Sequence, residues 1–222
     1  MTVNATQTEY MHLEDYIDHT LLKPTATIAE IKKLCADAIK YELYAVCVHG
    51  CHIALAKNEL NGSPVKLAAV VGFPLGAMTT EAKVFEAKEC ISNGADEIDM
   101  VINIGYLKSG LGEFVENDIK KVKKAIGNTV LKVIIETCFL TDKEKETACK
   151  IVMDSGAEFV KTSTGFGKGG ATYEDVILIK KIIGDKVKIK ASGGIKNKES
   201  ALKYIDLGVS RIGTSSGPSL LL

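Results

Sequence analysis

Three charged residues of this sequence lie inside apolar, β-branched segments: Asp99, Lys161 and Lys190. Burying an ammonium in such a segment is costly, and two lysines on neighbouring strands disfavour each other's charged form. Both effects lower an amine pKa from its reference of ~10.4 toward the range of about 7–8 that suits a nucleophile. The pattern therefore suggests a nucleophilic lysine. The alternative is that each lysine only pairs with a strand carboxylate such as Asp99 or Glu136.

A repeated unit places these three residues. A glycine ends a helix-like stretch and precedes a β-branched run at Gly94, Gly127, Gly156, Gly184 and Gly208, with spacings of 33, 29, 28 and 24 residues. That length fits one strand, one helix and two short loops. Asp99 and Lys161 each follow their glycine by five positions, and Lys190 follows its glycine by six. The unit therefore predicts that all three lie at similar heights in different strands.

The repeat predicts a (β/α)8 TIM barrel, with the active site at the carboxyl ends of the strands. Seven strands are expected at residues 44–49, 65–73, 95–101, 130–135, 158–162, 187–190 and 209–213. These runs are apolar on both faces, as parallel strands covered by helices are. An eighth strand would be the short segment 16–20, which periodicity alone does not identify. Without it, a doubly wound open sheet is the alternative.

The intervening segments carry helix signals. Capping-box spacing occurs at Thr27 with Glu30, at Thr141 with Glu144 and at Thr172 with Asp175. We expect one domain over residues 1–222, with residues 1–9 as a flexible tail. Lys132 and Lys188 come early in their strands, so we interpret both as structural residues near the bottom of the barrel.

Glycine-rich loops follow the last three expected strands. They are residues 165–170, 192–194 and 213–217. Bare N–H groups in such loops form the phosphate cups of many barrels. Arg211 is the only arginine, so backbone groups would have to do most of the phosphate binding. The alternative for any one loop is a tight turn.

A short segment contains Cys47, His49, Cys51 and His52. The spacing does not match a zinc ribbon, and no second cluster completes four ligands. We therefore expect no metal and no cofactor.

Composition excludes several classes of protein. The chain has 222 residues, with 28 basic and 28 acidic side chains and a pI near 6.9, so nucleic acid is not an expected partner. No apolar run reaches membrane-spanning length, and the first nine residues lack the features of a secretory signal. With six dispersed cysteines interpreted as reduced thiols, we expect a cytoplasmic protein without a membrane partner.

The motifs resemble the deoxyribose-phosphate aldolase family over nearly the whole chain. The resemblance runs from residues 17–24 to residues 212–216, and its most specific parts are residues 97–99, 160–167 and 190–195. It implies a class I aldolase that cleaves 2-deoxy-D-ribose 5-phosphate reversibly to acetaldehyde and D-glyceraldehyde 3-phosphate, without a metal, in deoxyribonucleoside catabolism. The alternatives are another Schiff-base or isomerase barrel acting on a phosphosugar, and a sugar-phosphate sensor without activity.

The resemblance also assigns roles to residues. It implies that Lys161 forms the imine, that Lys190 lowers its pKa and that Asp99 carries the proton relay. Substrate contacts are implied for residues of the pocket and of the phosphate cup, namely Asp18, Thr20, Leu22, Cys47, Gly165, Gly193, Gly194, Ser215 and Ser216. We also expect a homo-oligomer, either a dimer or a tetramer.

Two features depart from part of the family. Phe166 stands where some members have a lysine, so a side-chain contact to phosphate would have to come from Lys168. Some members also extend to a C-terminal tyrosine that assists proton transfer, whereas this sequence ends in Leu220–Leu222.

Overall fold

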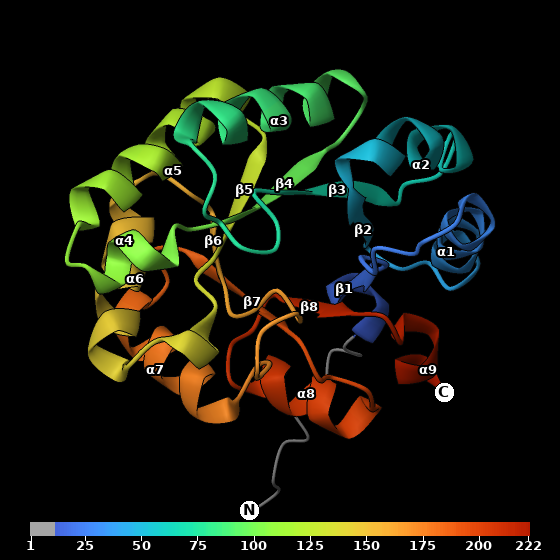
Figure 1. Ribbon diagram of the computed structural model, residues 1–222. Helices are drawn as coiled ribbons and strands as arrows, with labels where there is room; N and C mark the ends of the chain where they lie inside the picture. Colours follow the sequence, from blue (N-terminus) through green and yellow to red (C-terminus); the bar gives the residue numbers. More distant parts are fainter. Residues whose placement is uncertain (1–11) are drawn as a thin grey trace, which may run out of the picture.

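Eight parallel strands form a closed barrel in the computed structural model, which describes residues 12–222 (Figure 1). The strands are β1 (Ile17–Thr20), β2 (Ala45–His49), β3 (Lys66–Val71), β4 (Glu97–Val101), β5 (Val130–Ile134), β6 (Phe159–Lys161), β7 (Lys188–Ser192) and β8 (Arg211–Thr214). Each pairs with the next, and β8 pairs with β1. The predicted (β/α)8 barrel is confirmed, and the open sheet is wrong. The tail expected at residues 1–9 lies outside the described residues.

Helices surround the barrel and connect successive strands (Figure 1). They are α1 (Ile28–Lys40), α2 (Ile53–Glu59), α3 (Thr80–Ser92), α4 (Ile104–Lys108), α5 (Gly112–Ile126), α6 (Asp142–Asp154), α7 (Tyr173–Ile183), α8 (Lys198–Asp206) and α9 (Gly217–Leu221). Short 3-10 turns are found at Leu13–Tyr16, Gly50–His52 and Thr137–Phe139. Among residues 12–222, the helices are too short or too polar to cross a membrane.

Two of the three expected capping boxes are complete. At Thr27 and at Thr141 the hydroxyl accepts the N–H three residues on, and the glutamate at that position reaches back to the cap. At Thr172 the hydroxyl accepts the N–H of Asp175 at 3.1 Å, but the carboxylate of Asp175 pairs with Lys145 instead. The third helix start therefore has half of the predicted motif.

Strand residues alternate between two different environments. Ile98 and Met100 of β4 belong to the large apolar core between barrel and helices, whereas Glu97 and Asp99 face the barrel interior. A small apolar cluster fills the interior beside β2 and β3, formed by Leu22, Cys47, Ala68 and Val70 with Phe73 against it. The interior also carries charged side chains, among them Asp18, Glu97, Asp99, Lys132, Lys161 and Lys190. The polarity of the site is therefore built into the inward face of the strands.

Candidate active site

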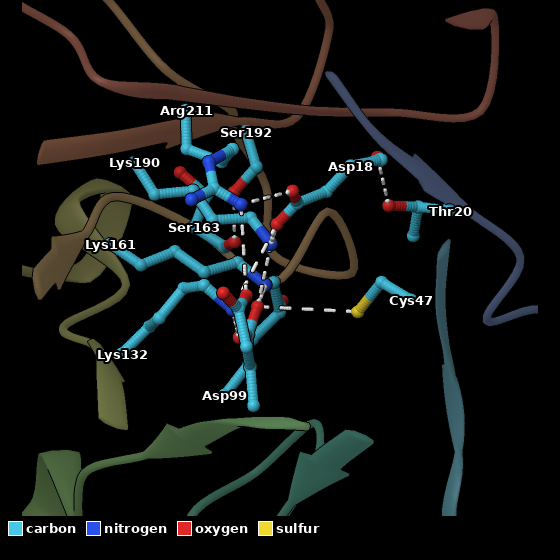
Figure 2. A network of polar contacts seen from close by, with 12 residues as sticks. Asp18, Thr20, Cys47, Asp99, Lys132, Lys161, Ser163, Lys190, Ser192 and Arg211 are labelled. Atoms are coloured by element: carbon cyan, nitrogen blue, oxygen red, sulfur yellow. Dashed lines mark hydrogen bonds and ion pairs between the residues drawn. The ribbon is translucent and has the colours of Figure 1, made fainter. Parts of the chain in front are cut away.

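Asp99 lies at the centre of the barrel and accepts hydrogen bonds from three lysines (Figure 2). Lys132 on β5 donates to Oδ1 at 2.6 Å. Lys161 on β6 and Lys190 on β7 both donate to Oδ2, at 2.8 and 2.7 Å. The register makes the last two residues Cα partners on adjacent strands. The structure thus brings together the three residues predicted to be catalytic.

A second carboxylate, Asp18 of β1, supports the first. It is fully buried, accepts from Lys190 through Oδ2, and accepts from Arg211 through Oδ1 at 3.1 Å. The guanidinium of Arg211 lies over the ring of Tyr44, 3.4 Å from its centroid. Asp18 was expected to line the substrate pocket, but it lies below the cavity and contacts the lysine network.

Burial and neighbouring charges favour a neutral amine at Lys161. Desolvation is the largest cause that lowers its pKa, and the ammonium of Lys190 lowers it further, while Asp99 opposes both. Both burial and the second ammonium are expected from the sequence, and burial is the larger of these two causes. An amine with a lowered pKa is deprotonated at a lower pH and is then free to attack a carbonyl.

The other two lysines are held as ammonium ions. Burial opposes the charge, but Asp18 and Asp99 together raise the pKa of Lys190. Asp99, despite its own burial, has a pKa held well below the usual range by Lys132, Lys161 and Lys190. The site therefore combines a carboxylate, a charged lysine and a lysine that tends to be neutral.

A cavity of about 370 Å³ opens above Lys161 at the carboxyl ends of the strands. Six of the expected substrate contacts line this cavity. They are Gly165, Gly193, Gly194 and Ser215 of the loops, with Thr20 of β1 and Leu22 of the loop that follows it. Ser216 and Cys47 are not among the lining residues. Cys47 lies deeper in the barrel, with Sγ 4.0 Å from Oδ2 of Asp99.

Glycines allow two of the loops to meet at the cavity wall. A Cβ on Gly170 would lie 2.2 Å from the carbonyl oxygen of Gly193, whose own φ is 87°. The N–H of Ala171 donates to the carbonyls of Ser192 and Gly193, at 3.0 and 3.1 Å. The loops after β6 and β7 thus form one continuous wall that larger residues would push apart.

The cavity mouth has an aromatic side and a cationic side. Phe166 lines the cavity and packs edge-on against Phe73, with ring centroids 5.4 Å apart. Lys168 is exposed and is not among the residues that line the cavity. Lys23 and Lys196 line the cavity instead. Neither lysine was predicted as a site residue, although Lys23 lies within the segment 17–24 and Lys196 directly follows the segment 190–195.

Lys132 and Glu136 are both buried, in surroundings that differ from those predicted from the sequence. Lys132 was expected near the barrel bottom, yet it is fully buried and pairs with Asp99 and with Glu97, in both cases at 2.6 Å. Glu136 follows β5 in a left-handed conformation, with φ of 53°, and accepts from the N–H and the hydroxyl of Thr164. Burial raises the pKa of Glu136. It holds the loop after β6 in place.

The cysteine and histidine segment does not form a ligand cluster. Across residues 12–222, no group of three or more His, Cys, Asp or Glu side chains is arranged to hold a metal ion. His49 instead bonds through Nε2 to the carbonyl of Leu22 at 2.8 Å and packs against Phe73. The segment contributes to loop packing.

Comparisons with known proteins agree with this geometry. A model of the DeoC/LacD family of aldolases matches residues 14–221. A deoxyribose-phosphate aldolase from Caldicellulosiruptor saccharolyticus is 56% identical over 93% of this chain and 95% of its own. The solved structure of an aldolase called QR15 superposes with a TM-score of 0.91 at 41% identity, covering 94% of this chain and 93% of its own. A tetrameric deoxyribose phosphate aldolase from Aeropyrum pernix superposes with a TM-score of 0.86 at 30% identity, covering 94% and 89%. The match over nearly the whole chain confirms the resemblance predicted from the motifs, and the chain belongs to the DeoC/LacD family of aldolases.

Proposed function

We propose that this aldolase reversibly cleaves 2-deoxy-D-ribose 5-phosphate to acetaldehyde and D-glyceraldehyde 3-phosphate through an imine on Lys161. The amine attacks the C1 aldehyde of the open-chain sugar, and loss of water gives a protonated imine. The C3 hydroxyl loses its proton, the C2–C3 bond breaks, and its electron pair moves into the imine to form an enamine. Glyceraldehyde 3-phosphate leaves, C2 of the enamine takes up a proton, and water releases acetaldehyde.

One observation carries this proposal: Lys161 is a buried lysine with a lowered pKa at the floor of a cavity of about 370 Å³. Its amine lies 2.8 Å from a carboxylate oxygen of Asp99. A positive imine formed at this point would gain the same carboxylate as its counter-ion. The position therefore favours both the attacking amine and the charged intermediate.

We assign proton transfer to Asp99, acting through a water on the cavity side. Asp99 stays a carboxylate because its three lysines lower its pKa. Loss of a positive charge beside it would raise that pKa and make it a better proton acceptor. Lys190 stays charged and keeps Asp99 oriented through a bond of 2.7 Å. These roles rest on the contacts and on the family resemblance together.

The phosphate end of the substrate fits the loop wall opposite Lys161. Gly193, Gly194, Ser215 and Lys196 line the cavity, and their N–H groups and the Lys196 ammonium are the donors that we propose for the phosphate. An anchored phosphate would hold the C2–C3 bond over the lysine, which converts binding energy into orientation. We propose a direct contact for Ser215, and for Ser216 a supporting role through its N–H, which donates to Thr214 at 3.0 Å.

The setting of the protein follows from its thiols and its relatives. All six cysteines are free in the structure, as expected where thiols remain reduced, so we propose a cytoplasmic enzyme. We also propose that it acts as a single catalytic domain within a homo-oligomer; the relative from Aeropyrum pernix is described as a tetramer. Sedimentation at several concentrations tests the assembly.

Trapping of the imine tests the proposed function. The protein is reduced with borohydride in the presence of acetaldehyde, digested, and mapped by mass spectrometry. We expect a two-carbon adduct on Lys161, together with enzymatic release of acetaldehyde from deoxyribose 5-phosphate. An adduct that maps to Lys190 would reverse the assignment of the two lysines. Isomerisation without acetaldehyde release would contradict the reaction.

A further inference from the structure

The barrel interior holds more buried cations than carboxylates. Seven ionisable side chains, each at most 8% exposed, form one set connected by ion pairs. The carboxylates are Asp18, Glu97 and Asp99, and the cations are Lys132, Lys161, Lys190 and Arg211. If every group were charged, one positive charge would be left without a counter-ion. A buried excess charge is costly, so the set favours the loss of one proton.

The carboxylates are shared unequally among the cations. Lys132 pairs with Asp99 and Glu97 at 2.6 Å and lies 3.9 Å from Asp18. Lys190 pairs with both aspartates. Lys161 has one carboxylate, Asp99, which it shares with the other two lysines. Lys161 is therefore the lysine of the set that is least stabilised by carboxylates.

Arg211 makes the excess permanent although it is not among the residues that line the cavity above Lys161. Its guanidinium lies 3.1 Å from Asp18, 3.7 Å from Glu97 and 3.4 Å from the Tyr44 ring centroid. Because a guanidinium does not give up its proton in proteins, it permanently takes a share of two carboxylates. The three lysines are then stabilised only by the remaining negative charge of the carboxylates.

Other titratable groups near Lys161 do not restore the balance through an ion pair. Glu136, at the end of β5, uses its oxygens on Thr164 and has a pKa raised by burial. Cys47 of β2 is a buried thiol whose pKa is also raised by burial. Outside the barrel, α6 contributes Cys149, whose pKa is raised to about 12, and Lys145 pairs with Asp175 of α7.

We propose that Arg211 and Glu97, neither of which lines the cavity, are positioning residues that set the protonation state of Lys161 by fixing the surplus of buried cations at one. The inference rests on the proposed imine chemistry at Lys161. It differs from the influence of Lys190 in acting through the total charge of the set. Substitutions of these two residues, both outside the cavity lining, should therefore shift the pH at which Lys161 becomes neutral in opposite directions.

The direction of each change follows from the count. Arg211→Met leaves three cations against three carboxylates, so a protonated Lys161 is balanced and the amine needs a higher pH to become neutral. Glu97→Gln leaves four cations against two carboxylates, so the amine becomes neutral at a lower pH. The double variant has three against two and restores the original surplus. Lys33→Met removes a positive charge from the surface of α1 and is the control for a change of charge outside the barrel.

The test measures imine formation at Lys161 as a function of pH. Each variant is reduced with cyanoborohydride and acetaldehyde between pH 5 and 10, and the two-carbon adduct on the Lys161 peptide is quantified. We expect the midpoint to rise by about one pH unit in Arg211→Met and to fall by about one unit in Glu97→Gln. The double variant and Lys33→Met should lie close to the parent protein.

Several results would overturn the proposal. Midpoints that stay in place, that move in the same direction for both single variants, or that do not return in the double variant exclude control by the charge count. If Arg211 and Glu97 had only a structural role, their substitution would lower the amount of folded protein, as seen by circular dichroism, without shifting the two midpoints in opposite directions. If Arg211→Met does not fold, the direction of the Glu97→Gln shift decides alone. Absence of any adduct at Lys161 in the parent protein would instead overturn the proposed function itself.

Discussion

Lys161 and Lys190 donate to the same oxygen of Asp99, at 2.8 and 2.7 Å, yet their pKa values move in opposite directions. The difference comes from Asp18, which pairs with Lys190 and not with Lys161. One extra carboxylate thus separates two otherwise similar lysines into a charged residue and a nucleophile.

Replacing Lys190 should change the pH range in which the imine forms, whereas replacing Lys161 should abolish imine formation. In Lys190→Leu the neighbouring ammonium is gone, so the pKa of Lys161 rises and the amine is neutral only at higher pH. We expect weak borohydride trapping of acetaldehyde at pH 7 that recovers as the pH is raised. The Lys161→Leu control should show no adduct at that site and no turnover at any pH. Full trapping of Lys190→Leu at pH 7 would mean that burial alone lowers the pKa of Lys161 enough.

Adding a negative charge to the loop after β8 should weaken use of the phosphorylated substrate. Ser215→Asp places a carboxylate on the cavity wall, where it would repel the substrate phosphate. We expect KM for deoxyribose 5-phosphate to rise at least tenfold, equivalent to about 1.4 kcal/mol, and acetaldehyde condensation to fall less. Ser216→Asp, one residue outside the lining, should have a smaller effect. Equal losses in both reactions would place the phosphate elsewhere.

Stability should depend on a buried ion pair between α3 and α5. Lys83 is fully buried, pairs with Asp118 at 2.5 Å, and donates to the carbonyl of Val101 at 2.9 Å. Lys83→Met leaves a buried carboxylate without its cation, which should cost about 3–5 kcal/mol in urea unfolding. The double variant with Asp118→Leu should recover part of that loss.

An exposed pair serves as the matched control for this measurement. Lys33 and Asp37 of α1 lie 2.6 Å apart on the surface, and Lys33→Met should cost less than about 1 kcal/mol. Similar losses for Lys33→Met and Lys83→Met would show that burial of the inner pair does not matter.

Activity should survive prolonged treatment with EDTA. The protonated imine accepts the electrons of the broken bond, so the reaction needs no metal as an electron sink. The measurement is acetaldehyde release before and after dialysis against chelator. Loss of activity that zinc restores would contradict the imine mechanism and would direct attention to Cys47, His49 and Cys51.

The sequence predicted most of the fold because apolar strands and helix-ending glycines repeat at a regular interval. It identified β1 only through the count of eight. Asp18 and His19 interrupt the apolar pattern of that strand. The charge of Asp18 is stabilised by Lys190 and Arg211, which come from the far end of the chain. Periodicity cannot show partners that only closure of the barrel supplies.

Lys132 shows why heights counted along a strand can mislead. The position was correctly placed inside a strand, but its flexible four-carbon stem carries the ammonium to Asp99, its Cα partner on β4. Glu136 is expected as a strand carboxylate that could pair with a lysine, but it follows the end of β5 and accepts from Thr164 instead. Both residues are visible only when side-chain reach and loop geometry are known.

The contacts of Asp18 join the two ends of the barrel. Its partners Lys190 and Arg211 lie 172 and 193 positions away in the sequence. No fragment that lacks the first or the last strand can hold the complete charge set, and a half-closed barrel would leave ammonium groups without counter-ions. The complete charge set around Lys161 therefore depends on closure of the barrel between β1 and β8.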